Sequence, residues 1–211
     1  MGNPKFRVIS VSPQKKRKNR YTVQLSNGDV FGISGDVLLS NPIHTGEVLN
    51  PKTIERLIGM EDLQKVRESA LTLLGYRMRS KKEMGSRLRK KGFTPVQVAS
   101  IMEELEYNGL IDDEKFGLSF ARDKVKMSLL GPIALKHRLK QHFSSFDKIE
   151  QICNTIYQEF PIESLIKNIV EKHSPAILKN NPKNKKRLVN QLKRKGYFWS
   201  DIEPVLDQFD I

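Results

Sequence analysis

The 211-residue chain has one cysteine, one tryptophan and four histidines, and these scarcities exclude several classes of protein. The single Cys153 cannot form an internal disulfide, and its presence fits a reducing compartment. None of the four histidines pairs with Cys153 in a zinc pattern. The sequence also lacks a phosphate-binding glycine loop, a nucleophile elbow and an HExxH helix. We therefore expect no enzyme, no metal and no cofactor.

Long apolar runs are missing as well. No stretch approaches the roughly 20 apolar residues that a membrane span needs. The first residues have no apolar core of a signal peptide, and Phe6 stands where a myristoylation signal has Ser or Thr. We expect a soluble, cytoplasmic protein without membrane contact.

Acidic residues are outnumbered, with 24 Asp and Glu against 37 Lys and Arg, a formal net charge of +13. This excess predicts a polyanionic or acidic partner, the alternative being a basic protein without a charged partner. Asp112 and Asp113 are adjacent, but the helix dipole explains acids in a first turn better than a metal site or a nuclease that includes Glu114.

Two helix starts lie close together. Ser80 followed by Glu83 forms a capping box, and Thr94, Pro95 and Gln97 repeat that pattern. Gly92 between them suits the positive φ just past a helix end. The sequence predicts two helices over residues 80–107, joined by a turn.

The apolar positions of this pair recur 51 and 104 residues later. The matching residues are Met84, Leu88, Val98, Ile101 and Leu105; Leu135, Leu139, Ile149, Ile152 and Ile156; and Leu188, Leu192, Ile202, Val205 and Phe209. The cap position recurs as Ser80, Gly131 (before Pro132) and Asn184. Such spacing indicates an internal repeat.

Each repeat has a further helix before the pair. Its apolar positions in the first repeat are Leu63, Val66, Ala70, Leu74 and Met78, and Ala121, Val125 and Leu129 match the last three. We predict a mainly α fold, a tandem array of three three-helix repeats over residues 61–108, 109–160 and 161–211. The second repeat opens at Gly109, which closes the preceding helix, and Asp112 or Asp113 caps its first helix. Pro161 starts the first helix of the third repeat, in which Ser174–Pro182 is a polar loop.

Residues 1–60 predict a small β-rich extension that contains a β-hairpin. Strand-like segments are Phe6–Val11, Tyr21–Leu25 and Val30–Ile33, and Thr53–Met60 suits a short helix. Asn27-Gly28 is a hairpin signal that requires positive φ at both residues. The loop Pro13–Arg20 contains five cations and no acid. These cations (Lys15, Lys16, Arg17, Lys18 and Arg20) either keep the loop solvated or contact phosphates.

Two basic clusters are the strongest functional signal. The first contains Arg77, Arg79, Lys81, Lys82, Arg87, Arg89, Lys90 and Lys91, with Glu83 as its one acid. The second spans Lys183–Lys195 without an acid and includes Lys185, Lys186, Arg187, Lys193, Arg194 and Lys195. Both occupy the same helix of repeats one and three, so we expect them to bind a phosphate- or carboxylate-rich partner. Trp199, before the last helix, is a partly buried anchor or a stacking residue, and Cys153 is structural.

The segments RSKKE, LRKKGF, VQVASIMEEL and GLIDDEKF, followed by Gly131-Pro132, together resemble the RecX family of bacterial regulatory proteins, from about Glu61 to Asp210. The departures are Gly117, where the family usually has alanine, and Phe143-Ser144 in place of a glycine-aliphatic turn. The resemblance implies a monomer that binds the RecA recombinase filament on DNA and restrains its ATPase and strand exchange in recombination and repair. Single- or double-stranded DNA would be a secondary partner. The alternative is a basic helical-repeat protein that binds DNA directly.

Overall fold

The structure is a computed structural model that describes residues 5–173 and 181–210. It divides into two compact units. The first holds the residues up to Arg77 together with Gly85–Tyr107, and the second holds Met78–Met84 together with the residues from Asn108 onward.

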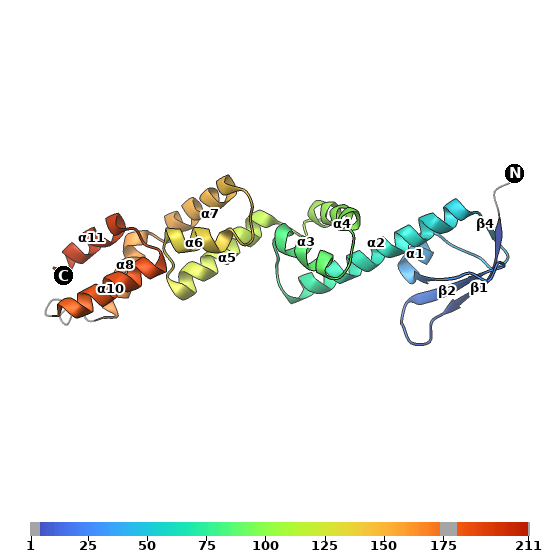
Figure 1. The fold of residues 1–211 in the computed structure, drawn as a ribbon, viewed down its shortest axis with the longest axis horizontal. Coiled ribbons are helices and arrows are strands. Elements are labelled where there is room, and N and C mark those ends of the chain that lie inside the picture. The colour runs from blue at the N-terminus through green and yellow to red at the C-terminus, as the bar shows by residue number, and fades with distance from the viewer. Residues whose placement is uncertain (1–4, 174–180, 211) are drawn as a thin grey trace. The chain divides into compact units, whose positions relative to one another are not determined.

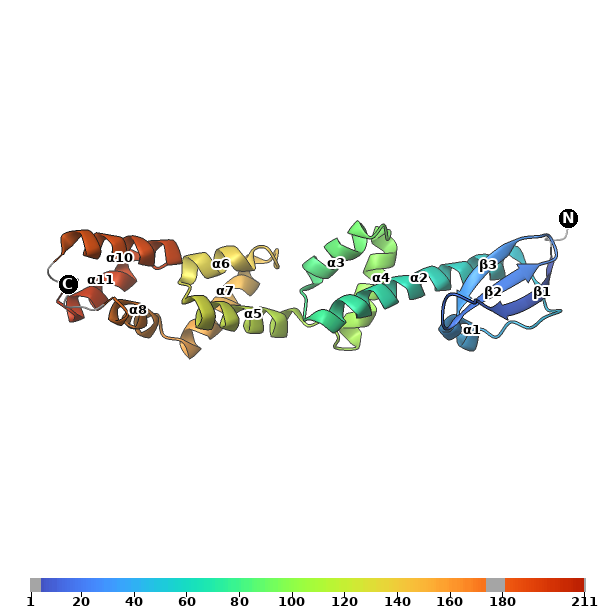
Figure 2. The ribbon, with the colours of Figure 1, turned by 90° about the horizontal axis from the view of Figure 1, so that it is seen from below.

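The N-terminal part is a four-stranded antiparallel sheet in the order β3-β2-β1-β4. Figure 1 labels β1, β2 and β4, and Figure 2 labels β3 beside β1 and β2. The strands are β1 (Phe6–Pro13), β2 (Arg20–Leu25), β3 (Val30–Ser34) and β4 (Val48–Leu49), with the short helix α1 (Gly35–Ser40) after β3. Val8, Val23 and Ile33 form the centre of its apolar core. The three expected strands are present, whereas α1 and β4 were not expected.

The turn between β2 and β3 differs from the expected one. Gly28 has a φ of +90°, but Asn27 is not among the residues with positive φ. The Gly28 N–H donates to the Leu25 carbonyl at 3.0 Å, and the Asn27 side chain accepts from the Asp29 N–H at 3.1 Å. These bonds make a three-residue loop in which a single left-handed glycine suffices.

Helix α2 (Pro51–Tyr76) runs from the extension into the first repeat without a break. The Asn50 side chain caps it, accepting from the Thr53 N–H at 2.8 Å. The short helix expected over Thr53–Met60 is therefore the start of a longer one. The expectation that Met78 belongs to this helix is wrong, because α2 ends two residues earlier and leaves Met78 about half exposed at 49%.

Two capping arrangements start α3 (Lys81–Lys90) and α4 (Pro95–Tyr107), as expected. The Ser80 hydroxyl accepts from the Glu83 N–H at 3.2 Å. Thr94 and Gln97 bond reciprocally, with the Gln97 N–H donating to the Thr94 hydroxyl at 3.3 Å and the Thr94 N–H to the Gln97 side chain at 3.0 Å. Gly92 has a φ of +94° in the turn between the helices.

The remaining helices are α5 (Asp113–Ser128), α6 (Pro132–Leu139) and α7 (Phe146–Glu159), then α8 (Ile162–Glu171), α10 (Pro182–Lys195) and α11 (Trp199–Gln208). In each repeat the first helix packs on the third: α2 on α4, α5 on α7 and α8 on α11 (Figures 1 and 2). Residues 61–173 and 181–210 contain helices and turns but no strand. The expected mainly α fold with a small N-terminal β region is confirmed.

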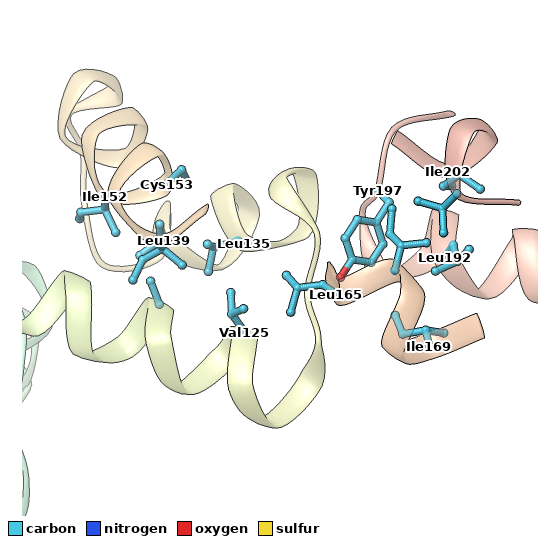
Figure 3. Close-up of a cluster of buried hydrophobic side chains, with 14 of the residues drawn as sticks. Val125, Leu135, Leu139, Ile152, Cys153, Leu165, Ile169, Leu192, Tyr197 and Ile202 are labelled. Atoms are coloured by element: carbon cyan, nitrogen blue, oxygen red, sulfur yellow. The ribbon is translucent and has the colours of Figure 1, made fainter. Parts of the chain in front are cut away.

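The repeat positions form the cores. Fourteen of the fifteen apolar positions named above are buried, and Phe209 is partly buried against the same cluster. Figure 3 shows Leu135 and Leu139 of α6 facing Val125 of α5 in one repeat, and Leu192 and Ile202 packed together in the next. The periodicity therefore identified the buried faces correctly.

One cap prediction is wrong. Asn184 lies inside α10, because the helix begins at Pro182 with Asn181 as its cap. The Asn181 side chain accepts from the Lys183 N–H at 3.0 Å and from the Asn184 N–H at 3.3 Å. The expected loop over Ser174–Pro182 falls, up to residue 180, outside the described residues. The other caps agree: Gly131 precedes α6, and the Asp112 side chain caps α5.

Candidate polyanion-binding surface

Helix α10 has one buried edge and a cationic exposed face. Leu188 and Leu192 are buried in the core, and no acid lies anywhere on the helix. The exposed members of the predicted cluster are Lys185, Lys186, Arg187, Lys193 and Arg194. Arg187, Asn190, Lys193 and Arg194 line a hollow of about 520 Å³. Like charges held on one face bind a polyanion at little cost to folding.

Lys195 has a different environment from its neighbours. Its ammonium donates to the Ser128 carbonyl at 2.6 Å, at the C-terminal end of α5. A cation there is favoured by the helix dipole and satisfies a carbonyl that has no partner within its own helix. The structure thus places Lys195 at the junction between the second and third repeats.

The same junction joins the end of α10 to the start of α6 (Figure 2). The Gly131 N–H donates to the Lys195 carbonyl at 2.8 Å, and the Ile133 N–H donates to the Gly196 carbonyl at 3.0 Å. Gly131 offers no side-chain cap, so the next repeat satisfies the first N–H groups of α6. A β-carbon on Gly131 would lie 2.6 Å from the backbone carbon and oxygen of Gly196, so only glycine fits.

Two tyrosines hold the turn before α6. The Tyr197 hydroxyl donates to the Leu129 carbonyl at 2.9 Å, and the Tyr157 hydroxyl donates to the Leu130 carbonyl at 2.8 Å. Burial raises the pKa of both tyrosines above the ordinary phenol value, so both remain proton donors at any physiological pH. These bonds fix the base of α10 and, with it, the position of the cationic face.

The first predicted cluster divides into two sets. Arg79 is buried, with 7% of its surface exposed, and its guanidinium pairs with the Glu83 carboxylate. The Lys82 ammonium donates to the Lys140 carbonyl at 3.0 Å, and the Lys81 N–H donates to the Asp113 carboxylate at 2.8 Å. These three residues thus make contacts within the protein, and Arg77 is the exposed C-cap of α2.

The exposed remainder of this cluster is Arg87, Arg89, Lys90 and Lys91, at the end of α3 and in the following turn. Arg89 and Lys90 lie 104 residues before Lys193 and Arg194, at the same places of their repeats. We call Arg87, Arg89, Lys90 and Lys91 the α3 cluster. We call Lys185, Lys186, Arg187, Lys193 and Arg194 the α10 cluster. The equivalent helix α6 has only two Lys or Arg residues, Lys136 and Arg138, and the ammonium of Lys136 pairs with Glu150 at 2.6 Å.

The five cations of the predicted loop between β1 and β2 have two different environments. Lys15, Lys16, Arg17 and Lys18 are exposed. Arg20 instead begins β2 and pairs with Glu61 of α2 at 2.6 Å, and the same carboxylate accepts from the Ser34 N–H at 2.6 Å. Arg20 therefore ties the sheet to α2.

Residues considered for chemistry have structural roles here. Asp112 caps α5, and the neighbouring N–H of Lys115 lowers the pKa of its carboxyl. Burial raises the pKa of the Cys153 thiol to about 11, so the reactive thiolate is disfavoured. Among residues 5–173 and 181–210, no His, Cys, Asp and Glu side chains gather into a metal-binding group. In that same part of the chain, no helix has the length and apolar character needed to cross a bilayer.

Trp199 was expected in the turn before the last helix, but it is the first residue of α11. Its side chain is 45% exposed, and the Lys193 ammonium lies over its ring, 5.4 Å from the centroid. The sequence left an anchor and a stacking residue as alternatives, and this exposure favours contact with a partner.

Comparison with known proteins gives a consistent result. Residues 67–105 match the family model described as RecX, first three-helix domain. The chain is 27% identical over 208 residues to the regulatory protein RecX of Bacillus subtilis, covering 96% of this chain and 77% of the relative. It is 26% identical over 213 residues to the regulatory protein RecX of Oceanobacillus iheyensis, covering 97% of this chain and 77% of the relative.

Solved structures show the same fold. The crystal structure of a regulatory protein RecX superposes with a TM-score of 0.75 at 24% identity, covering 96% of this chain and 99% of the other. The structure of RecX from Lactobacillus salivarius gives 0.64 at 22% identity, covering 72% and 98%. The expected resemblance to the RecX family is confirmed.

Proposed function

We propose that this relative of the RecX proteins is a regulatory protein that binds the RecA recombinase filament on DNA and mostly inhibits its ATPase and strand exchange. It acts without catalysis of its own, as a cytoplasmic monomer in recombination and DNA repair. The observation that carries the proposal is the pair of exposed cationic clusters at matching places of α3 and α10. A regular polymer offers repeated acidic or phosphate sites, and repeated clusters suit such a partner.

The test is RecA ATPase on single-stranded DNA with this protein titrated in. We expect inhibition that rises with the ratio of protein to recombinase. Two variants examine the clusters: Arg89, Lys90 and Lys91 changed to Gln, and Lys185, Lys186 and Arg187 changed to Gln. Each removes three exposed charges and leaves the Lys82–Lys140 and Lys195–Ser128 hydrogen bonds intact. A matched control changes the exposed Lys52, Arg56 and Lys172, which lie outside both clusters.

Because both clusters bind one polymer, removing either one forfeits effective concentration as well as interaction energy. Either triple variant should therefore weaken inhibition strongly, and the combined variant only a little more, while the control inhibits as before. ATPase inhibition that survives in both triple variants would contradict a role for these clusters in filament binding.

The second candidate is a basic helical-repeat protein that binds DNA directly, and the acid-free α10 favours it. In that case the effects of the two variants should add independently. Each would also reduce the salt slope of DNA binding, by roughly 0.9 in log K per log salt for every duplex phosphate that the variant no longer neutralises. Measuring naked-DNA affinity and ATPase inhibition on the same variants separates the two functions.

A further inference from the structure

We propose that Trp199 and the adjoining end of α10 form a binding site for single-stranded nucleic acid, in which a base stacks on the indole and the backbone phosphates contact Lys193, Arg194 and Arg187. The site shares these three cations with the α10 cluster and so rests on the polyanion binding proposed for that cluster, but its ligand is the nucleic acid itself, without a recombinase. Trp199 is the one tryptophan of the chain, and its side chain is 45% exposed. Lys193 lies over the exposed indole, and Arg187 and Arg194 line the same hollow as Lys193. An exposed aromatic ring next to a cationic groove is the combination that single-strand binding uses.

The backbone just before Trp199 is anchored to the core and to the start of α11. Tyr197, two residues earlier, is 2% exposed and donates to the Leu129 carbonyl at 2.9 Å. The Phe198 N–H donates to the Asp201 carboxylate at 3.3 Å, so this acid, two residues after Trp199, is engaged in starting α11. Figure 3 shows the Tyr197 ring entering the core beside Leu192. The backbone that carries Trp199 is therefore anchored, and a base would meet a ring that needs little ordering.

Lys193 connects the indole to the cationic hollow. Its ammonium lies 5.4 Å from the centre of the Trp199 ring, and its side chain also lines the hollow of about 520 Å³ with Arg187, Asn190 and Arg194. That volume lies within the range of small-ligand sites, about 300–1,000 Å³. The hollow has three cations and one amide among its described lining residues, a composition that suits phosphate and sugar oxygens.

A single strand fits this arrangement better than a duplex. Stacking on a side chain requires a base whose face is available, and the bases of a duplex are stacked on each other. A duplex would meet the cations but not the indole. An acidic peptide would likewise engage the cations and leave the indole without a stacking partner.

Because the chain has one tryptophan, its fluorescence reports directly on the site. Titration with a dT oligonucleotide should quench the emission in proportion to binding. Inorganic polyphosphate at the same charge concentration should leave it nearly unchanged, because phosphates supply no base. Quenching that is equal for polyphosphate and for oligonucleotide would overturn the stacking role.

Variants supply a second measurement, the affinity for a labelled dT oligonucleotide without recombinase. Trp199→Ala should weaken binding by about 5- to 100-fold with an unchanged salt slope, and Trp199→Phe should recover part of the loss. Arg194→Gln should reduce the salt slope by about 0.7 in log K per log salt, for one single-strand phosphate. Tyr107→Ala is the matched control, since Tyr107 is 92% exposed on α4, and it should bind as the unchanged protein does.

Circular dichroism of each variant checks folding, which substitution of an exposed side chain should not disturb. The proposal is wrong if Trp199→Ala binds the oligonucleotide as tightly as the unchanged protein does. It is also wrong if the unchanged protein and the Trp199→Ala variant each bind duplex and single-stranded DNA with equal affinity. Because these measurements contain no recombinase, their failure leaves ATPase inhibition to be judged by its own experiment.

Discussion

Gly92 and Gly196 are equivalent helix ends 104 residues apart, with nearly the same φ of +94° and +89°, but their surroundings differ. A β-carbon on Gly92 would meet nothing within 4 Å. A β-carbon on Gly196 would lie 2.3 Å from the backbone nitrogen of Ala134. The end of α3 therefore requires glycine for its φ alone, whereas the end of α10 requires it also for its close approach to α6.

This difference predicts unequal effects of one substitution. Gly92→Ala should cost roughly 1–2 kcal/mol, the strain of a left-handed alanine. Gly196→Ala should cost at least about 2 kcal/mol more, because the backbone of α6 must move. Urea unfolding of both variants measures the two costs. Equal losses would mean that the junction between α10 and α6 contributes nothing to stability.

A second prediction concerns Gly117, whose added β-carbon would lie 2.4 Å from Cδ1 of Ile152 and 3.1 Å from Cζ of Phe143. Glycine at 117 thus leaves room mainly for the side chain of Ile152 and also for the buried Phe143. Gly117→Ala should destabilise by about 1–3 kcal/mol. Ile152→Val removes Cδ1, so in the double variant the loss should be smaller than the sum of the two single losses. Simple additivity would contradict this packing.

The third prediction concerns the repeat cores. Leu88, Leu139 and Leu192 are each buried at equivalent positions, with 0% of their surface exposed. Replacing any one by Ala should lower the free energy of unfolding by about 2–5 kcal/mol. Arg89→Ala, next to Leu88 but exposed, should change it by no more than about 0.5 kcal/mol. A comparable loss at Arg89 would show that the helix has been assigned the wrong buried face.

The fourth prediction concerns the loss of folding stability at low pH. The Arg67 guanidinium donates to Glu104 at 2.7 Å and lowers the pKa of that carboxyl, and the Lys115 N–H lowers the pKa of Asp112. Both pKa values are lower in the folded than in the unfolded chain. The stabilisation is therefore complete above the ordinary carboxyl pKa and is lost as the pH falls through the folded values, below about pH 4.

Unfolding in urea between about pH 2.5 and 7 should show this decline, and Glu104→Gln should make it shallower. Arg67→Gln should do the same, because it removes the donor that lowers the Glu104 pKa. A pH dependence that is unchanged in both variants would contradict the contribution of this pair.

The last prediction uses Cys153, which is 2% exposed and has a pKa raised by burial to about 11. A disulfide reagent at about pH 8 should label the folded protein slowly and the urea-unfolded protein at the rate of a free thiol. Rapid labelling of the folded protein would mean that the second repeat opens readily.

Local sequence signals predicted much of this fold. Ser80, Thr94 and Asp112 act through bonds that span three residues or fewer, so their roles were evident from spacing. The buried positions followed from the helical period, because one face of every helix had to be apolar. Elements without such a period were missed: α1 has six residues and β4 has two.

The roles of individual cations could not be predicted, because their partners lie far away in the sequence. Lys195 bonds to Ser128, 67 residues earlier, and Arg20 pairs with Glu61. Arg79 pairs locally with Glu83, but its burial depends on the packing of the whole repeat. Charge density thus predicted a candidate surface, whereas the geometry of the folded chain determines which of its charges face outward.

The start of α6 has a consequence for the order of the repeats along the chain. Because its first N–H groups bond to the carbonyls of Lys195 and Gly196, the second repeat depends on a successor. Helix α10 instead has the Asn181 side chain as its own cap, so its first N–H groups need no bond from a following repeat. A duplication of residues 109–160 placed last would leave a helix without its cap.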